Sequence, residues 1–96
     1  MPNYVILTRW TDQGVRAVKE TAQRAQQFRV DCERRGIKVR DFVWTQGRYD
    51  MVVSLEAPDE RTMMAAMLAL GNLGNVRTET LRAFSEGEMQ ETLRKM

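Results

Sequence analysis

The sequence contains no histidine and only one cysteine, Cys32. One cysteine excludes an intramolecular disulfide. The lack of histidine excludes His-containing zinc sites, serine–histidine and cysteine–histidine nucleophile pairs, and histidine proton shuttles. Carboxylates could still hold magnesium or calcium, but no EF-hand spacing is present. We therefore expect no protein-ligated metal and no bound cofactor.

Long apolar runs are also missing, since the longest extends only from Met63 to Leu70. A bilayer span needs about 20 apolar residues. The N-terminal segment lacks the basic region of a secretory signal. These observations predict a cytoplasmic protein without a membrane partner.

The net charge is only +2, so the composition does not indicate strong electrostatic binding to nucleic acid. The charge is unevenly spread, because residues 1–48 are net basic and residues 49–96 are net acidic. This asymmetry could favour self-association, although charge balanced within one small domain is the simpler interpretation.

Turn signals and hydrophobic spacing divide the chain into strands and helices. In chain order we expect strand 4–8, a long helix from Asp12 to about Arg35, strands 39–45 and 49–56, a helix from Pro58 to about Leu70, strand 76–84, and a short helix from Ser85 to near Lys95. This order, β-α-β-β-α-β followed by a helix, predicts an α+β, ferredoxin-like fold. Right-handed crossovers place both long helices on one face of a four-stranded antiparallel sheet with strand order 4-1-3-2.

The sheet face that the helices leave uncovered, here called the open face, should not be polar. In the first strand Tyr4 and Ile6 point to one side and Val5 and Leu7 to the other, so both sides are apolar. A second copy packed sheet to sheet is the simplest cover. We therefore expect a homodimer or higher homo-oligomer formed through this face.

Four segments, 1–8, 11–16, 47–50 and 70–84, resemble the GYD-domain family. The family takes its name from a Gly-x-Tyr-Asp motif, which is present here as Gly47, Tyr49 and Asp50. The resemblance covers nearly the whole chain, so residues 1–96 are interpreted as one GYD-like domain. It implies a dimeric α+β barrel, a group that includes cofactor-free oxygenases, haem enzymes and plain binding proteins. The fold alone does not choose among these activities.

The turn that contains this motif is the first candidate site. Arg48, Tyr49 and Asp50 could lie at a pocket mouth, where Tyr49 and Asp50 hydrogen-bond a polar ligand and Asp50 acts as a base if desolvated. The structural alternative is favoured: Gly47 shapes the turn, Tyr49 begins the third strand, and Asp50 caps backbone amides or pairs with an arginine.

The second candidate is Arg29, which a helical wheel places inside the apolar stripe of the long helix. It could reach an anionic ligand, but pairing with a carboxylate such as Asp41, Asp50 or Glu79 is favoured. Cys32 lies on the same stripe and is interpreted as a core residue, because no base is available to activate it.

Together these residues favour a homo-oligomeric module that binds a small polar or aromatic ligand between helices and sheet. The candidate ligand-binding residues are Arg29, Trp44, Arg48, Tyr49 and Asp50. The alternative is a cofactor-free oxygenase or isomerase of the dimeric α+β-barrel type. Binding of nucleic acid is not expected, because the sheet lacks an aromatic RNA-binding stretch.

Overall fold

The computed structural model describes residues 1–96. Its elements are β1 (Asn3–Trp10), α1 (Asp12–Arg16), the short 3-10 helix η1 (Val18–Glu20), α2 (Thr21–Arg34), β2 (Lys38–Trp44), β3 (Met51–Glu56), α3 (Glu60–Asn72), β4 (Val76–Ala83) and α4 (Glu86–Leu93). The predicted α+β, ferredoxin-like order with an added C-terminal helix is confirmed.

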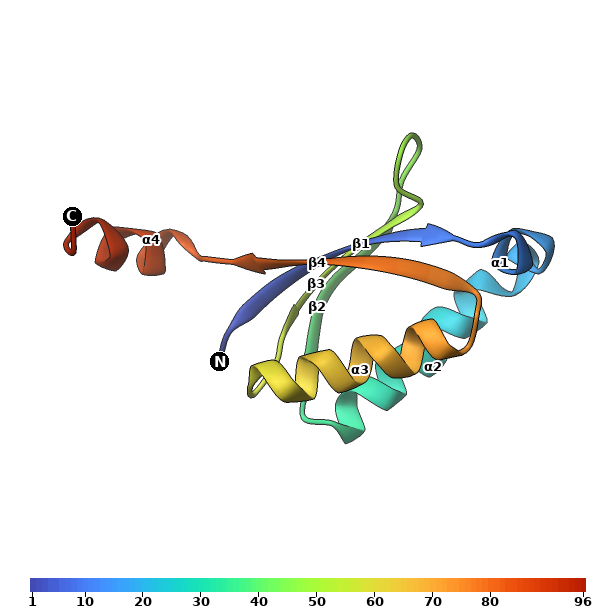
Figure 1. The fold of residues 1–96 in the computed structure, drawn as a ribbon, viewed down its shortest axis with the longest axis horizontal. Helices are drawn as coiled ribbons and strands as arrows, with labels where there is room; N and C mark the ends of the chain where they lie inside the picture. Colours follow the sequence, from blue (N-terminus) through green and yellow to red (C-terminus); the bar gives the residue numbers. More distant parts are fainter.

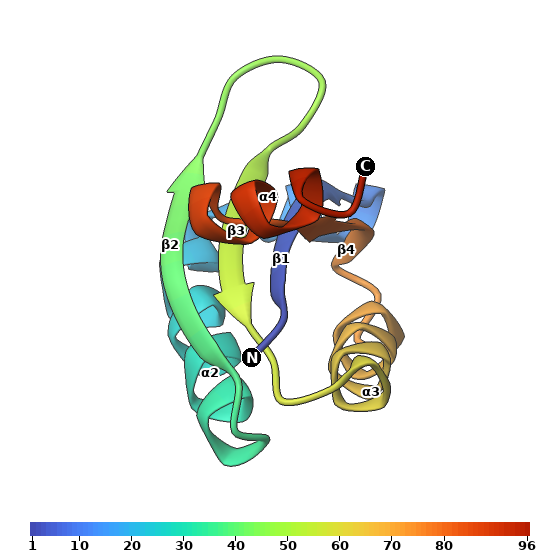
Figure 2. The ribbon, with the colours of Figure 1, turned by 90° about the vertical axis from the view of Figure 1, so that its left-hand side faces the viewer.

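The four strands form one antiparallel sheet in the order β2-β3-β1-β4, which is the predicted order read from the other edge. Helices α2 and α3 cover one face of this sheet and leave the open face uncovered (Figure 1). Helix α2 lies nearest β2 and α3 nearest β4 (Figure 2). The outer strand β2 contains a β-bulge between Val39 and Asp41.

The core lies between the helices and the covered face of the sheet. Ile6 and Leu55 are each 1% exposed at its centre. Cys32 from α2 and Met63 from α3 close over them. Cys32 is fully buried, which confirms its predicted core role, and Met63 and Met67 pack in the same core, whereas Met64 points outward and is 61% exposed.

The expected long helix from Asp12 to Arg35 is wrong, because the structure breaks it into α1, η1 and α2. Ala17 leaves helical geometry with φ −110° and ψ 28°. The break shifts the helical phase between α1 and α2, and Val15 of α1 is 53% exposed. Within α2 the core-facing side chains are Ala25, Phe28 and Cys32. Arg29 therefore lies on the exposed side of α2.

The loop between β2 and β3 is longer than predicted. Strand β3 begins at Met51, so Tyr49 and Asp50 lie in the loop and not in the strand. The Asp50 backbone bonds to Thr45 and Thr8, which ties the base of the loop to β1. Gly47 occupies the left-handed region at φ +112°, the conformation expected of a turn glycine.

The chain ends in an arm, defined as Phe84, Ser85 and α4. The arm extends past the end of the sheet at which β1 begins, away from α2 and α3 (Figures 1 and 2). Ser85 and Glu88 form a capping box at the start of α4. None of the helices is long and apolar enough to cross a bilayer.

Candidate functional site

A partly open cavity of about 430 Å³ lies between α2, α3 and the sheet. The sheet supplies its floor, with Ile6, Thr8 and Val53 among the contributing side chains. Phe28 from α2 and Leu70 from α3 also line the cavity. Most of the lining is apolar, and a cavity of this size can hold a small organic molecule.

Small side chains keep this space open. Ala25 of α2 and Ala69 of α3 line the cavity where larger residues would fill it. Aromatic rings form a continuous series beside it: Phe28 meets Phe42 edge-on at 6.3 Å between centroids, and Phe42 meets Trp44 at 4.8 Å. Such rings offer flat, rigid surfaces to an apolar or aromatic ligand.

Polar side chains are concentrated at the α2 side of the cavity, where Thr21, Arg24, Gln27 and Asp31 contribute to the lining. The two charged groups are already paired within the helix, Arg24 with Glu20 at 3.1 Å and Asp31 with Arg35 at 2.9 Å. A ligand would therefore meet an apolar interior and a polar rim.

One end of the cavity is closed by a clasp, defined as the contact of residues 11–14 with residues 73–75. The Thr11 N–H donates to the Asn75 carbonyl at 3.0 Å, and Gln13 Nε2 donates to the Leu73 carbonyl at 3.1 Å. Gly14 packs so closely that a Cβ there would lie 2.0 Å from the Asn75 oxygen. The clasp thus fixes α1 on the turn between α3 and β4, and two of its residues, Leu73 and Asn75, line the cavity.

Trp44 and Arg29 lie beside this cavity without lining it. The Trp44 indole N–H donates to the Thr21 hydroxyl at 3.0 Å, which links the end of β2 to the start of α2. The Arg29 guanidinium lies over the Phe42 ring at 5.3 Å. Arg29 forms no ion pair, so the expected pairing with a carboxylate is wrong and a cation–π contact takes its place.

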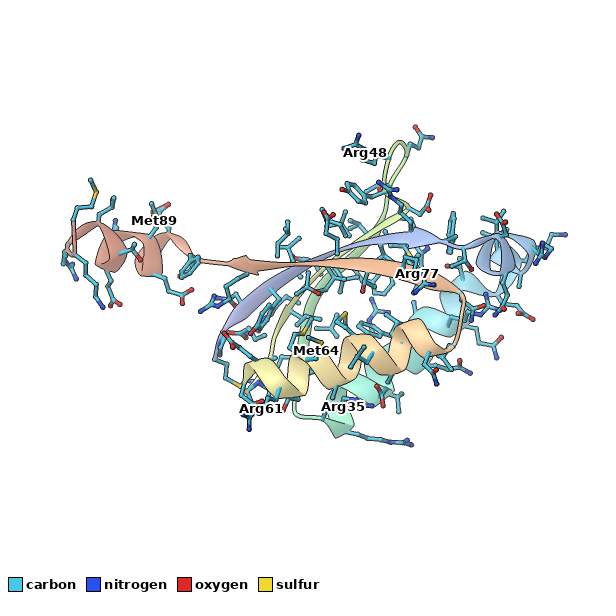
Figure 3. The ribbon with its side chains drawn as sticks, in the orientation of Figure 1. Arg35, Arg48, Arg61, Met64, Arg77 and Met89 are labelled. Carbon is cyan, nitrogen blue, oxygen red and sulfur yellow. The ribbon has the colours of Figure 1, made fainter.

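The other three candidates lie together on the opposite side of the sheet. The Tyr49 hydroxyl donates to Glu79 Oε2 at 3.1 Å, and the Arg9 guanidinium lies 5.1 Å from the Tyr49 ring centre. Asp50 Oδ2 accepts the Trp10 backbone N–H at 2.9 Å, which agrees with the favoured structural interpretation of a cap. Arg48 is exposed near the tip of the loop (Figure 3).

The structure therefore separates the five candidates into two groups, and the cavity lining was missed by sequence reasoning. Thr8 offered a signal: it is a polar residue in register with the core-facing positions of β1, and it is 4% exposed. Ala69 offered none, because a small residue on a helix is compatible with either a cavity or close packing. Burial raises the pKa of the Cys32 thiol to about 12, which fits the inert core role.

Comparison with known proteins adds two findings. The family model of the GYD domain matches residues 4–93. A protein of Thermus thermophilus, named glutamine synthetase and cystathionine beta-lyase binding protein, is 32% identical over 90 residues, which cover 93% of this chain and 95% of that protein. No solved structure matches the chain.

Proposed function

The chain belongs to the GYD-domain family, and we propose that it is a homo-oligomeric binding module holding a small molecule between its helices and its sheet. The observation that supports this best is the cavity of about 430 Å³. Its apolar interior and polar rim suit a flat apolar or aromatic body with one polar group. Thr21, Arg24 and Gln27 are placed to meet that polar group.

The candidate residues divide between two surfaces in this proposal. Arg29 and Trp44 act at the cavity rim, because both stack on Phe42, which lines the cavity. Arg48, Tyr49 and Asp50 would reach a ligand only if it lay against the open face. The charged lining groups Arg24 and Asp31 are both held in ion pairs, so no observation favours the alternative of a cofactor-free oxygenase or isomerase.

A cavity-filling variant tests the ligand site. Ala69→Phe places a ring in the cavity and should reduce binding of the fluorescent probe anilinonaphthalene sulfonate at least about tenfold, because the occupied volume is lost. Ala65→Phe, the same change at an exposed position one turn earlier, should leave binding unaltered. Native mass spectrometry of freshly purified protein would show whether the same variant loses a retained molecule. Equal probe binding by both variants would refute the site.

Self-association is proposed through the open face. Register and alternation place Val5, Leu7 and Val52 there, all half-buried, together with Val43 at 50% exposure and Leu81 at 44%. They form an apolar band across all four strands, and such a band on a soluble protein marks an interaction surface.

Sedimentation equilibrium at micromolar concentration tests the association. We expect a dimer or larger assembly that Val43→Lys combined with Leu81→Lys converts to monomer. Met64→Lys combined with Leu68→Lys is the control, since both residues are exposed on α3, beyond the open face. A monomeric wild-type protein would overturn the proposal.

A second candidate function is recognition of enzymes. The Thermus relative is named for binding glutamine synthetase and cystathionine beta-lyase, and we infer that this chain also binds a metabolic enzyme. Met64 and Leu68 support this role, because they lie one turn apart on α3 and are 61% and 65% exposed. Co-sedimentation with each purified enzyme, using the Met64→Lys, Leu68→Lys variant as the negative control, tests it. Binding of neither enzyme by the wild-type protein would contradict the inference.

A further inference from the structure

The floor of the cavity carries a buried hydroxyl group that has no partner within the protein. Thr8 lies in β1, one of the two middle strands of the sheet, and only 4% of the residue is exposed. None of the side-chain hydrogen bonds of the protein reaches its hydroxyl. Buried polar side chains in native proteins are nearly always hydrogen-bonded, so this exception calls for an explanation.

The Thr8 hydroxyl opens onto the cavity. Its side chain belongs to the cavity lining. The Tyr4 hydroxyl is the one buried side-chain polar atom that is both fully enclosed and without a partner, so the Thr8 oxygen, which also lacks a partner, is not sealed off by protein. Figure 2 shows α2 and α3 at opposite borders of the sheet, which leaves the middle strands facing the space between the helices.

The other polar groups of the lining are already engaged or lie within reach of water. The Thr21 hydroxyl accepts an indole N–H at 3.0 Å, and Asn75 Oδ1 accepts from Gln13 Nε2 at 2.9 Å. Both charged lining groups are held in the ion pairs described above. Gln27 is exposed and Trp10 is half-buried. The floor hydroxyl is thus the deeply buried polar group that is left for a ligand.

The surroundings of this hydroxyl contain no charge. Met51 of β3 and Thr78 of β4 flank Thr8 in register, and Ile6 and Val53 line the same floor. A charged ligand group placed there would lose its hydration without gaining a counter-charge. A threonine hydroxyl both donates and accepts hydrogen bonds, so an uncharged hydroxyl or carbonyl is the group that suits it.

We propose that the cavity takes an aromatic molecule whose inner end carries an uncharged hydroxyl or carbonyl, hydrogen-bonded to the Thr8 hydroxyl. The proposal rests on the small-molecule function proposed above and adds a second polar contact to the one at the rim. Water in the cavity can satisfy Thr8 before the ligand arrives. A ligand that displaces this water without replacing its hydrogen bond gives up that contact, so the site selects oxygenated aromatic molecules over plain hydrocarbons.

A matched pair of probes tests this assignment. Naphthol and methylnaphthalene, substituted at the same ring position, have nearly the same shape, but only naphthol carries a hydroxyl. Thr8→Val removes the protein hydroxyl and keeps the branched side chain. In isothermal titration calorimetry, Thr8→Val should weaken naphthol binding at least about tenfold and change methylnaphthalene binding less than about threefold, because only naphthol loses a hydrogen bond.

The comparison is made between proteins for each probe, because methylnaphthalene is the more hydrophobic molecule whichever protein it meets. Its retained binding also shows that Thr8→Val has kept the cavity. Thr8→Ser preserves the hydroxyl and should bind naphthol within about threefold of the wild type. Thr80→Val removes an exposed hydroxyl of β4 outside the lining and should leave the binding of both probes unchanged.

The outcomes separate this proposal from the function beneath it. Binding of neither probe by the wild-type protein would overturn the ligand site and the role of Thr8 together. If the wild-type protein binds the probes and Thr8→Val weakens both equally, or weakens neither, the site stands and the role of Thr8 is overturned.

A second measurement uses only the wild-type protein and does not depend on how the variants fold. Nuclear Overhauser contacts should join the ring protons beside the naphthol hydroxyl to the methyl group of Thr8. Bound naphthol that shows these contacts only from the opposite end of its ring system would refute the assignment.

Discussion

The clasp between residues 11–14 and 73–75 makes Gly14→Ala the most informative single substitution. The added Cβ would lie 2.0 Å from the Asn75 carbonyl oxygen and 3.3 Å from Trp10 Cδ1. Since Cβ contacts under 3.0 Å essentially do not occur, the two segments must separate by at least 1 Å (3.0 minus 2.0). The hydrogen bond from the Thr11 N–H to that same oxygen, now 3.0 Å, would then be lost.

The expected loss of stability follows from these contacts. Two or three clasp hydrogen bonds at about 1 kcal/mol each and an overpacking cost of about 1–3 kcal/mol oppose a gain of about 1 kcal/mol from replacing glycine in a helix. The free energy of unfolding should therefore fall by about 2–5 kcal/mol, out of a total on the order of 5–14 kcal/mol for a chain of this length.

Urea unfolding at fixed protein concentration measures this difference. Gly71→Ala is the matched control, because its Cβ would meet nothing within 4 Å and the residue lies inside α3. We expect that control to be neutral or to gain up to about 1 kcal/mol. If Gly14→Ala is as stable as Gly71→Ala, the clasp does not constrain the fold and the reasoning is refuted.

Three further predictions concern single groups. Asp50→Ala should lower stability by about 1–2 kcal/mol, because the Trp10 N–H loses its acceptor, whereas an unchanged urea midpoint would exclude the capping role. Cys32 should resist a thiol reagent at pH 8 until the protein unfolds, since burial raises its pKa to about 12; rapid labelling of folded protein would contradict this. Backbone hydrogen bonds lower the pKa of Asp59 and Glu88 below the values in the unfolded chain. The stability that each carboxylate contributes is therefore fully present above its pKa in the unfolded chain and is lost as the pH falls through its pKa in the folded protein. Circular dichroism between pH 5 and 2 should show helix loss that Glu88→Gln reduces.

The sheet could be predicted from the sequence because its signals are local and repeated. The order of the elements, together with right-handed crossovers, predicted the strand order, and the helix expected from Ser85 begins at Glu86. The break at Ala17 could not be predicted, because it depends on the docking of α1 against the turn before β4.

The candidate site was harder to predict from the sequence than the sheet, because it too depends on tertiary contacts. The predicted position of Arg29 depended on a helical wheel drawn for one continuous helix, and the structure interrupts that helix at Ala17. Asp50 was correctly given a capping role, but its partner, the Trp10 amide, belongs to a strand forty residues away. The cavity lies between α2, α3 and the sheet, and both Ala25 and Ala69 line it. Neither alanine alone predicts a cavity, because the space depends on both small side chains together.

The bulge in β2 has a consequence for the size of any assembly. The extra residue disturbs the regular ladder between Val39 and Asp41, and β2 also carries Lys38 and Arg40. Such an edge is a poor template for another strand. On the other border of the sheet β4 has no neighbouring strand. Edge-to-edge addition is therefore disfavoured at one of the two borders, and growth that needs both borders cannot continue from copy to copy, which favours closed complexes of fixed size over fibres.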